Sequence, residues 1–274
     1  MIIACTPTYN RRWTWEFSKN CMLSQTIKPD RWIVLDNSSS PEYDWSPAKE
    51  LPWVDYVRVE GDRSIGSLRT QCLKLALEAG AEYIVFWDDD DYYPPTRIST
   101  GVNALLTKPT ADIATSSRMM LLLVRENVML ETGPFGDSHG TAATYTIRRR
   151  YAETHTFPDA RRGEELGFTN QWTASMVQVP SEETIVVIGH GRNTVDKSVI
   201  LQTPHIYNAK VVNSTNGKMW MRMRWPVPWD LFQSTFFASR CDQPQENTPK
   251  VQSRLAEHQI RHTEGTAASS EHRA

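Results

Sequence analysis

The sequence from residue 83 to residue 95 reads Tyr83-Ile84-Val85-Phe86-Trp87-Asp88-Asp89-Asp90-Asp91-Tyr92-Tyr93-Pro94-Pro95. Its apolar run predicts a buried strand that ends abruptly at four carboxylates. Carboxylates this close repel one another, so their ionised forms need a cation nearby. Mg²⁺ and Mn²⁺ prefer such oxygen ligands and usually combine one or two carboxylates with substrate phosphates. The stretch predicts a divalent metal site with a diphosphate behind it; the alternative is a solvated acidic turn.

The overall composition is that of an ordinary globular protein. The 274 residues suit one large domain, or one domain with appendages, and 39% hydrophobic residues suffice for a substantial core. A formal charge of −2 argues against a globally basic nucleic-acid binder. The four cysteines, Cys5, Cys21, Cys72 and Cys241, have no C-x-x-C spacing, which predicts reduced thiols, no zinc site and a cytoplasmic protein. No stretch has the length of a signal peptide or a membrane span.

The first half of the chain alternates between apolar runs and helical patterns. Strands are predicted at residues 2–6, 31–35 and 56–59, and a helix capped by Ser64 or Ser67 precedes the strand at residues 83–87. Such alternation predicts right-handed crossovers and a mainly parallel sheet flanked by helices. Ligands bind these sheets at the carboxyl ends of the strands. We therefore expect Thr8, Asp36 and the four aspartates to meet at one edge.

Several motifs occur in a characteristic order: Pro7-Thr8-Tyr9-Asn10-Arg11, Ser24-Gln25-Thr26, Leu35-Asp36-Asn37-Ser38, Arg69, and a D-x-D-D pattern at Asp88–Asp91. This order resembles the nucleotide-sugar glycosyltransferases of the GT-A fold, family 2-like. The resemblance covers about the first 115 residues well and extends more thinly to about residue 195. It implies a GT-A (Rossmann-like) α/β fold.

The resemblance also implies roles for individual residues. Those expected to bind the nucleotide are Thr6, Pro7, Thr8, Tyr9, Arg11, Asp36, Arg69, Asp88 and Asp89. Asp90 is the expected chief metal ligand, with Asp88 or Asp89 as its partner, and His190 is a further candidate contact to the metal or diphosphate. The alternatives are that Asp36 only caps a turn, that Arg69 is an exposed helix residue paired with Asp62 or Glu78, and that His190 is structural.

Strands are predicted in the second half at residues 111–115, 119–124, 128–131, 141–147 and 185–188. The second and third of these form a hairpin that suits the antiparallel portion of the sheet. Residues 133–140 are rich in glycine and predict a flexible lid or acceptor wall. Three arginines at residues 148–150 either attract a phosphate-bearing acceptor or begin a solvated helix.

A second chemical signal is Arg162-Gly163-Glu164-Glu165-Leu166-Gly167-Phe168. In the resembling family, a Gly-Glu-Asp-like element that opens a helix carries the carboxylate that deprotonates the acceptor hydroxyl. Glu165 aligns with that base, and a register error of one residue would select Glu164 instead. A hydroxyl is a weak nucleophile at neutral pH, so a positioned base is required in any case. The alternative is that both glutamates only favour a helix N-terminus.

The predicted domain organisation follows from these signals. Residues 1–200 form the glycosyltransferase domain, with a nucleotide-binding half at about 1–115 and an acceptor-binding half at about 116–200. Residues 201–242 form an extension that docks on the domain, although the Trp, Met and Arg residues at 218–229 also suit a membrane surface or nucleic acid. Residues 243–274 form a polar tail.

The sequence thus predicts an inverting glycosyltransferase that depends on Mn²⁺ or Mg²⁺. Its donor would be a UDP- or GDP-linked sugar, and its acceptor a glycan, a lipid-linked glycan, a protein or modified DNA. The alternatives are a noncatalytic module that binds nucleotide sugars or glycans, and a nucleotidyltransferase. We expect a cytoplasmic protein that is either free or peripheral to a membrane.

Overall fold

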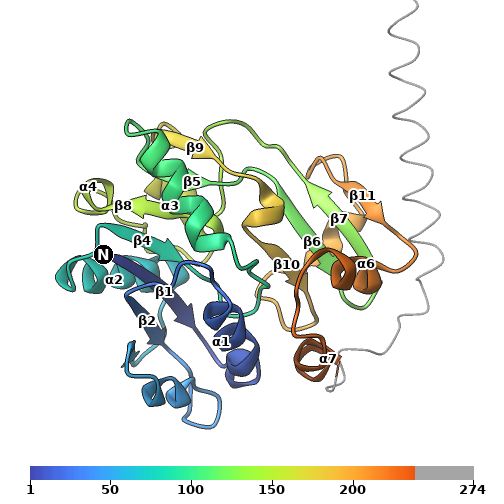
Figure 1. Cartoon of the computed structure of the whole chain (residues 1–274), viewed down its shortest axis with the longest axis horizontal. Coiled ribbons are helices and arrows are strands. Elements are labelled where there is room, and N and C mark those ends of the chain that lie inside the picture. The colour runs from blue at the N-terminus through green and yellow to red at the C-terminus, as the bar shows by residue number, and fades with distance from the viewer. Residues whose placement is uncertain (238–274) are drawn as a thin grey trace, which may run out of the picture. The chain divides into compact units, whose positions relative to one another are not determined.

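The computed structural model describes residues 1–237, which belong to two compact units (Figure 1). The first unit comprises Met1–Met119 and Pro134–Val187, and the second comprises Met120–Gly133 and the chain from Ile188 on. The predicted division at residues 200 and 242 stays a prediction. The predicted tail at 243–274 and Cys241 lie outside the described residues.

A seven-stranded sheet forms the centre of the first unit, in the order β3-β2-β1-β4-β8-β5-β9. Neighbouring strands among β1 to β4 are parallel, β8 runs antiparallel to β4 and β5, and β9 is parallel to β5. The predicted mainly parallel α/β sheet is therefore confirmed. Its strands are β1 (Ile2–Thr8), β2 (Arg31–Asp36), β3 (Val54–Arg58), β4 (Tyr83–Phe86), β5 (Ile113–Thr115), β8 (Thr146–Arg148) and β9 (Met176–Gln178).

Helices cover both faces of this sheet (Figure 1). Successive strand residues point to opposite faces, and in β5 Ile113 packs in the cluster that contains Leu73 of α2 (Ile65–Glu78). The next residue, Ala114, packs against Leu105 of α3 (Arg97–Thr107). The remaining helices of this unit are α1 (Trp15–Leu23), α4 (Arg149–Ala152) and α5 (Glu164–Phe168), with 3-10 turns at Arg12–Thr14, Ser46–Glu50, Ala142–Thr144 and Ser181–Glu183.

Local signals explain why α2 begins and ends where it does. The Ser64 hydroxyl accepts a hydrogen bond from Ser67 N at 3.0 Å, so Ser64 is the predicted N-cap. After the helix, Gly80 adopts a φ of 87°, which favours glycine and stops the helix. The chain then enters β4 and reaches the four aspartates at its carboxyl end.

One predicted strand is wrong. Residues 141–147 alternate between small, β-branched and aromatic residues, yet only Thr146–Arg148 forms a strand. The preceding residues form a 3-10 turn because the Thr144 hydroxyl donates to the Thr141 carbonyl oxygen at 2.7 Å and also bonds to the Thr115 hydroxyl. Such local bonds from side chain to backbone compete with strand pairing.

The second unit contains most of a four-stranded sheet in the order β10-β6-β7-β11. Its strands are β6 (Met119–Leu123), β7 (Val128–Thr132), β10 (Val186–Gly189) and β11 (Lys210–Asn213). The hairpin β6-β7 was predicted, but its assignment to the main sheet is wrong. The sequence pattern defines the two strands without saying which sheet they join.

The segment at residues 218–229 packs back onto the second unit. Helix α6 (Gly217–Arg224) contacts β7 and β11, and its Met221 is fully buried, whereas Met219 and Met223 are exposed. Helix α7 (Trp229–Phe237) follows, and a 3-10 turn spans Lys197–Leu201. In the part of the chain that is described, no helix is both long enough and apolar enough to cross a membrane.

Candidate active site

Three polar strand ends meet at one edge of the seven-stranded sheet, as predicted. Thr8, the last residue of β1, pairs with Asp36, the last residue of β2. The Thr8 hydroxyl also donates to Asp89 Oδ2 at 2.6 Å. Because β1 lies between β2 and β4, the first loop touches both acidic positions.

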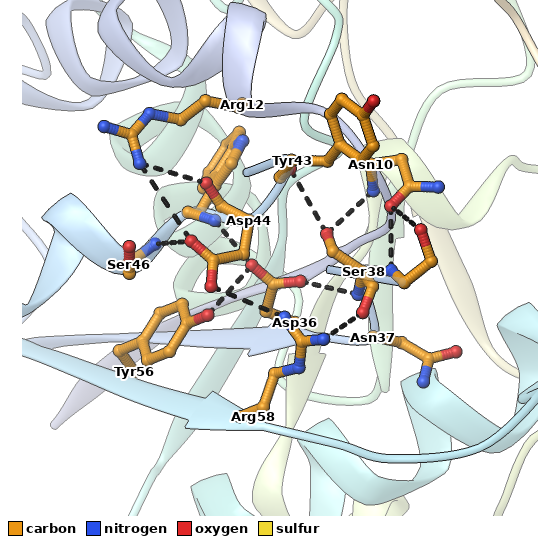
Figure 2. Close-up of polar contacts among 12 residues, drawn as sticks. Asn10, Arg12, Asp36, Asn37, Ser38, Tyr43, Asp44, Ser46, Tyr56 and Arg58 are labelled. Atoms are coloured by element: carbon orange, nitrogen blue, oxygen red, sulfur yellow. Dashed lines mark hydrogen bonds and ion pairs between the residues drawn. The ribbon is translucent and has the colours of Figure 1, made fainter. Parts of the chain in front are cut away.

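Asp36 organises the loop that follows β2 (Figure 2). Its carboxylate is fully buried, and Oδ1 accepts a hydrogen bond from Ser38 N at 2.8 Å. Oδ2 accepts from Trp45 N at 2.6 Å and from the Tyr56 hydroxyl at 3.1 Å. Both oxygens are thus used to hold the loop in shape. Burial, with the charges of Asp36 and Asp44, raises the pKa of Tyr56.

A second carboxylate, Asp44, supports the same loop (Figure 2). Its Oδ1 accepts from Ser46 N at 2.9 Å, and its Oδ2 lies 3.4 Å from Arg58 Nη1. Burial acts to raise the pKa of Asp44, but the bonds from Ser46 and the charge of Arg58 hold it below its usual value. Asp44 therefore stays ionised and pairs with Arg58.

Asn10 joins the first loop to the loop after β2, a link that the sequence analysis missed. Its backbone N–H donates to Ser38 Oγ at 2.8 Å, and its side-chain Oδ1 accepts from Ser39 N at 2.8 Å. The φ of Asn10 is 54°, a conformation in which asparagine is enriched. In the sequence, Asn10 and Ser38 are recognisable only as turn-forming residues. That character does not show that they contact each other.

The other predicted residues of the first loop differ in exposure. Thr6 and Pro7 are buried, and the Thr6 hydroxyl accepts from Trp32 Nε1 at 2.9 Å, which supports the aromatic packing under the sheet. Tyr9 is 55% exposed, so its ring is available to a ligand. Arg11 extends to the acidic cluster, where its Nη1 lies 2.5 Å from Asp90 Oδ2.

The four aspartates have different environments. Asp88 accepts from Arg69 Nη2 at 3.0 Å, and Asp90 pairs with Arg11. Asp89 is buried, and burial raises its pKa to about 7, with Asp90 adding to the rise while Arg11 and Thr8 oppose it. Asp91 is also buried. The two carboxylates that remain partly accessible are those of Asp88 and Asp90, at 28% and 14%.

The donor chemistry of this cluster fits a hard divalent cation. Among the described residues, no group of three potential ligands is placed to hold a metal ion. A hard divalent ion usually combines one or two carboxylates with substrate phosphates. The accessible carboxylates of Asp88 and Asp90 each face an arginine, so positive charge already compensates them. A dication would join or replace that charge.

Arg69 connects the acidic cluster to the predicted base. It is only 4% exposed, and its Nε lies 3.2 Å from Glu164 Oε1 while its Nη2 contacts Asp88. Burial acts to lower its pKa, but the charges of Asp88 and Glu164 raise it above the ordinary value. The alternative of an exposed Arg69 paired with Asp62 or Glu78 is therefore wrong. Its Nη1 is buried and has no hydrogen-bond partner among the described residues.

The two glutamates at the start of helix α5 have different environments. Gly163 has a φ of 67°, and the helix begins at the next residue. Glu164 is 5% exposed and points to Arg69; burial raises its pKa although Arg69 opposes the rise. Glu165 is half-buried, and its Oε1 lies 3.4 Å from both Thr141 Oγ1 and Ala142 N. Glu165 thus faces the loop before β8.

Tyr93 is a further residue that the sequence analysis did not assign to the site. Its hydroxyl oxygen accepts from Asp88 N at 2.6 Å, and its ring stacks on Trp87 with centroids 3.9 Å apart. Tyr93 is fully buried and so fixes the backbone at the first aspartate. The aromatic pair after the acidic run was its only signal.

His190 belongs to the second unit. Its Nδ1 accepts from Arg192 N at 3.1 Å, and its Nε2 lies 3.0 Å from Asn193 Nδ2. Both ring nitrogens are therefore used within its own loop. The predicted metal or phosphate contact of His190 stays a prediction.

Comparison with known proteins identifies the fold and finds a family that part of the chain matches. Residues 3–133 match glycosyl transferase family 2. TarS 1–349 of S. aureus is 14% identical with a TM-score of 0.51, and the match covers 87% of this chain and 73% of that chain. The mannosyltransferase PcManGT from Pyrobaculum calidifontis, in complex with GDP-Man and Mn²⁺, is 14% identical with a TM-score of 0.52 and coverages of 98% and 79%. The complex of TarS 1–349 with UDP is 15% identical with a TM-score of 0.52, and the match covers 86% of this chain and 72% of that chain. None of the curated proteins compared with the chain matches it.

The fold and the site together define a glycosyltransferase of the GT-A fold. Residues 3–133, just under half of the chain, match the model of glycosyl transferase family 2.

Proposed function

We propose that the protein transfers a sugar from a nucleoside diphosphate sugar to an acceptor hydroxyl by one inverting displacement. The observation that carries this proposal is the position of Arg69, which contacts both Asp88 and Glu164. This buried cation connects the acidic end of β4 to the N-terminus of α5. The two carboxylate motifs predicted for donor and base are thus adjacent in the fold.

The donor side is built from the first loop and the aspartates. Tyr9 is exposed beside the loop that Asp36 holds, and we assign the nucleoside to these two loops. The buried Nη1 of Arg69 is a donor that a phosphate oxygen would satisfy. PcManGT binds GDP-Man and Mn²⁺, and TarS binds UDP, which supports a nucleoside diphosphate donor.

Asp88 and Asp90 would hold Mn²⁺ or Mg²⁺. When bound, the ion stabilises the negative charge of the diphosphate. Arg69 and Arg11 place further positive charge at the same end of β4. Because these groups are already oriented by ion pairs, little reorganisation is needed as charge develops on the leaving group.

Glu165 is the general base in this proposal. The acceptor oxygen forms a bond to the anomeric carbon, its proton passes to Glu165, and the bond from that carbon to the diphosphate oxygen breaks with the electron pair leaving on the nucleoside diphosphate. Glu164 is occupied by Arg69, whereas Glu165 is half-buried and makes only long contacts with Thr141 and Ala142. Glu165 is therefore the glutamate more accessible to a hydroxyl.

The donor assignment is tested by binding. Asp90→Asn should weaken the affinity for UDP- or GDP-sugars measured in Mn²⁺ by calorimetry, while the melting temperature without ligand stays that of a folded protein. Glu153→Gln is the matched control, because Glu153 forms an exposed pair with Arg149 on α4. Unchanged donor affinity in a folded Asp90→Asn variant would shift the assignment to another aspartate.

Product analysis separates the proposed reaction from nucleotidyl transfer. From a nucleotide sugar, sugar transfer releases a nucleoside diphosphate, whereas nucleotidyl transfer releases a sugar phosphate. Chromatography of the nucleotide products after incubation with a panel of UDP- and GDP-sugars distinguishes these outcomes. The nucleotide sugar that is turned over fastest in this panel identifies the donor.

A further inference from the structure

The loop before β8 is held firmly, although its glycines predict a flexible lid. Gln178 Nε2 donates to the carbonyl oxygens of Asp137 and His139 at 2.8 and 2.9 Å, and Gln178 Oε1 accepts from Ser117 N at 2.7 Å. A Cβ at Gly140 would lie 2.0 Å from Thr115 Oγ1, so only glycine allows this close approach. The loop therefore presents His139 from a fixed backbone.

The turn after α5 has an uncommon backbone. Asn170, Gln171 and Trp172 have φ values of 49°, 57° and 64°, three consecutive left-handed residues without a glycine. Gln171 N donates to the Leu166 carbonyl at 2.8 Å, and Trp172 N donates to Thr169 Oγ1 at 3.3 Å. Left-handed conformations are costly for non-glycine residues and concentrate at functional sites. Here they direct Trp172 towards the loop.

Trp172, His139 and Phe135 form one aromatic group, which we call the aromatic platform. The rings of His139 and Trp172 have centroids 4.4 Å apart, and those of Phe135 and His139 are 5.0 Å apart. Phe135 is 38% exposed, and His139 and Trp172 are each partly exposed. The rings of Tyr145 and Phe168, by contrast, are fully buried in the core.

Glu165 contacts the loop that carries His139, through Thr141 and Ala142. Burial lowers the pKa of the His139 imidazole, although the charge of Glu165 opposes that change. His139 Nδ1 is buried and has no hydrogen-bond partner among the described residues. The neighbourhood therefore combines aromatic surface, an unsatisfied polar nitrogen and the proposed base.

We propose that the aromatic platform is an acceptor subsite and that the acceptor is a carbohydrate whose sugar ring packs on Trp172 and His139. Sugar rings have an apolar face of C–H groups that suits aromatic surface and an edge of hydroxyls that suits polar groups. This inference rests on the proposed function. Glu164 contacts Arg69, which contacts Asp88, whereas Glu165 contacts the loop that carries His139. The acceptor hydroxyl must lie beside the base.

The first experiment measures binding without any reaction. Saturation-transfer NMR uses a panel of methyl hexopyranosides, including gluco, galacto, manno and N-acetyl forms, with glycerol 3-phosphate and a serine peptide as probes of the other acceptor classes. The proposal expects transfer to ring C–H protons of at least one glycoside, and loss of that signal in Trp172→Ala. Binding of only the phosphate or only the peptide, or of no glycoside, would overturn it.

The second experiment measures turnover. Trp172→Ala should raise the acceptor KM at least tenfold more than the donor KM, and Trp172→Phe should restore most of the acceptor affinity. His155→Ala is the matched control, because His155 also stacks on an aromatic ring, that of Tyr151 at 3.8 Å. If Trp172→Ala fails to fold, His139→Ala tests the same surface.

The outcomes distinguish this inference from the proposed function. A rise in donor KM equal to that of acceptor KM would assign the platform to the donor sugar and overturn the acceptor subsite. Release of nucleoside diphosphate with no effect of any platform variant would leave the proposed function standing and the subsite wrong. Glycoside binding without release from any nucleotide sugar would support the subsite and contradict the proposed function.

Discussion

At the scale of single residues, the site depends on charges that are buried and paired. Arg69 is held between Asp88 and Glu164, and Arg11 pairs with Asp90. Removing one member of a buried pair leaves the other charge uncompensated, which costs more than the pair itself contributes. These ion pairs therefore contribute both to the stability of the fold and to the orientation of the charged side chains in the site.

We predict that Arg69→Met lowers the free energy of unfolding by about 3–5 kcal/mol, because Glu164 loses its buried partner. Urea denaturation measures this change, and calorimetry should find donor affinity lost as well. Arg31→Met is the control: Arg31 pairs with Asp55 at the surface, so stability should hardly change. Equal losses of unfolding free energy in the two variants would show that the buried ion pair of Arg69 contributes no more than a surface pair.

The thiols offer an independent test of burial. Burial raises the pKa of Cys21 to about 12 and raises that of Cys5 as well. The thiolate is the reactive form, so at pH 8 these residues are almost entirely protonated. We predict that the Cys241→Ser variant reacts with Ellman's reagent only after denaturation. A fast-reacting thiol in the folded variant would contradict the buried positions of Cys5, Cys21 and Cys72.

At the scale of elements, the sequence predicted the strands that carry the donor side and missed the contacts between loops. Strands β1, β2 and β4 are short apolar runs followed by polar residues, a pattern that defines both type and end. The burial of Asp36 depends on Trp45 and Tyr56, and that of Arg69 on Glu164, which is 95 residues away. Local patterns carry no information on such partners.

The second half was harder for the same reason. Glu165 was located because the Gly163-Glu164-Glu165 element resembles the one that carries the base in the family. The platform was not, since Phe135, His139 and Trp172 have no common spacing. The prediction of a flexible lid at residues 133–140 did not take Gln178 into account. This residue lies in β9, and its side-chain amide donates to the backbone of the loop. Glycine there allows a close approach to Thr115 instead of motion.

We predict that Gln178→Ala loosens the loop and impairs acceptor use. Three hydrogen bonds would be lost, so amide exchange at residues 137–140 should become faster, while exchange in β1 and β4 stays slow. The acceptor KM should rise with the donor KM unchanged. Hydrogen exchange is measured by mass spectrometry. Unchanged protection of residues 137–140 in Gln178→Ala would contradict the view that Gln178 holds this loop.

At the scale of the whole molecule, the proposed function assigns donor and acceptor binding to different strands and loops of the first unit. The parallel strands β1, β2 and β4 present the carboxylates, and the loop before β8 together with α5 presents Glu165. The Arg69 bridge between Asp88 and Glu164 connects the two sides. In the proposed reaction, the sugar lies between them with the diphosphate on one face and the acceptor hydroxyl on the other, and the anomeric centre inverts.

The stereochemistry of transfer tests this account most directly. NMR at early times should follow a nucleotide sugar in Mn²⁺ with a saccharide acceptor, or with water, using the wild type, Glu165→Gln and Glu164→Gln. We predict a product of opposite anomeric configuration to the donor. Glu165→Gln should keep donor affinity but slow transfer about a hundredfold, because glutamine cannot take the proton. Retention of configuration, or transfer at the full rate in Glu165→Gln, would contradict the single displacement with Glu165 as base.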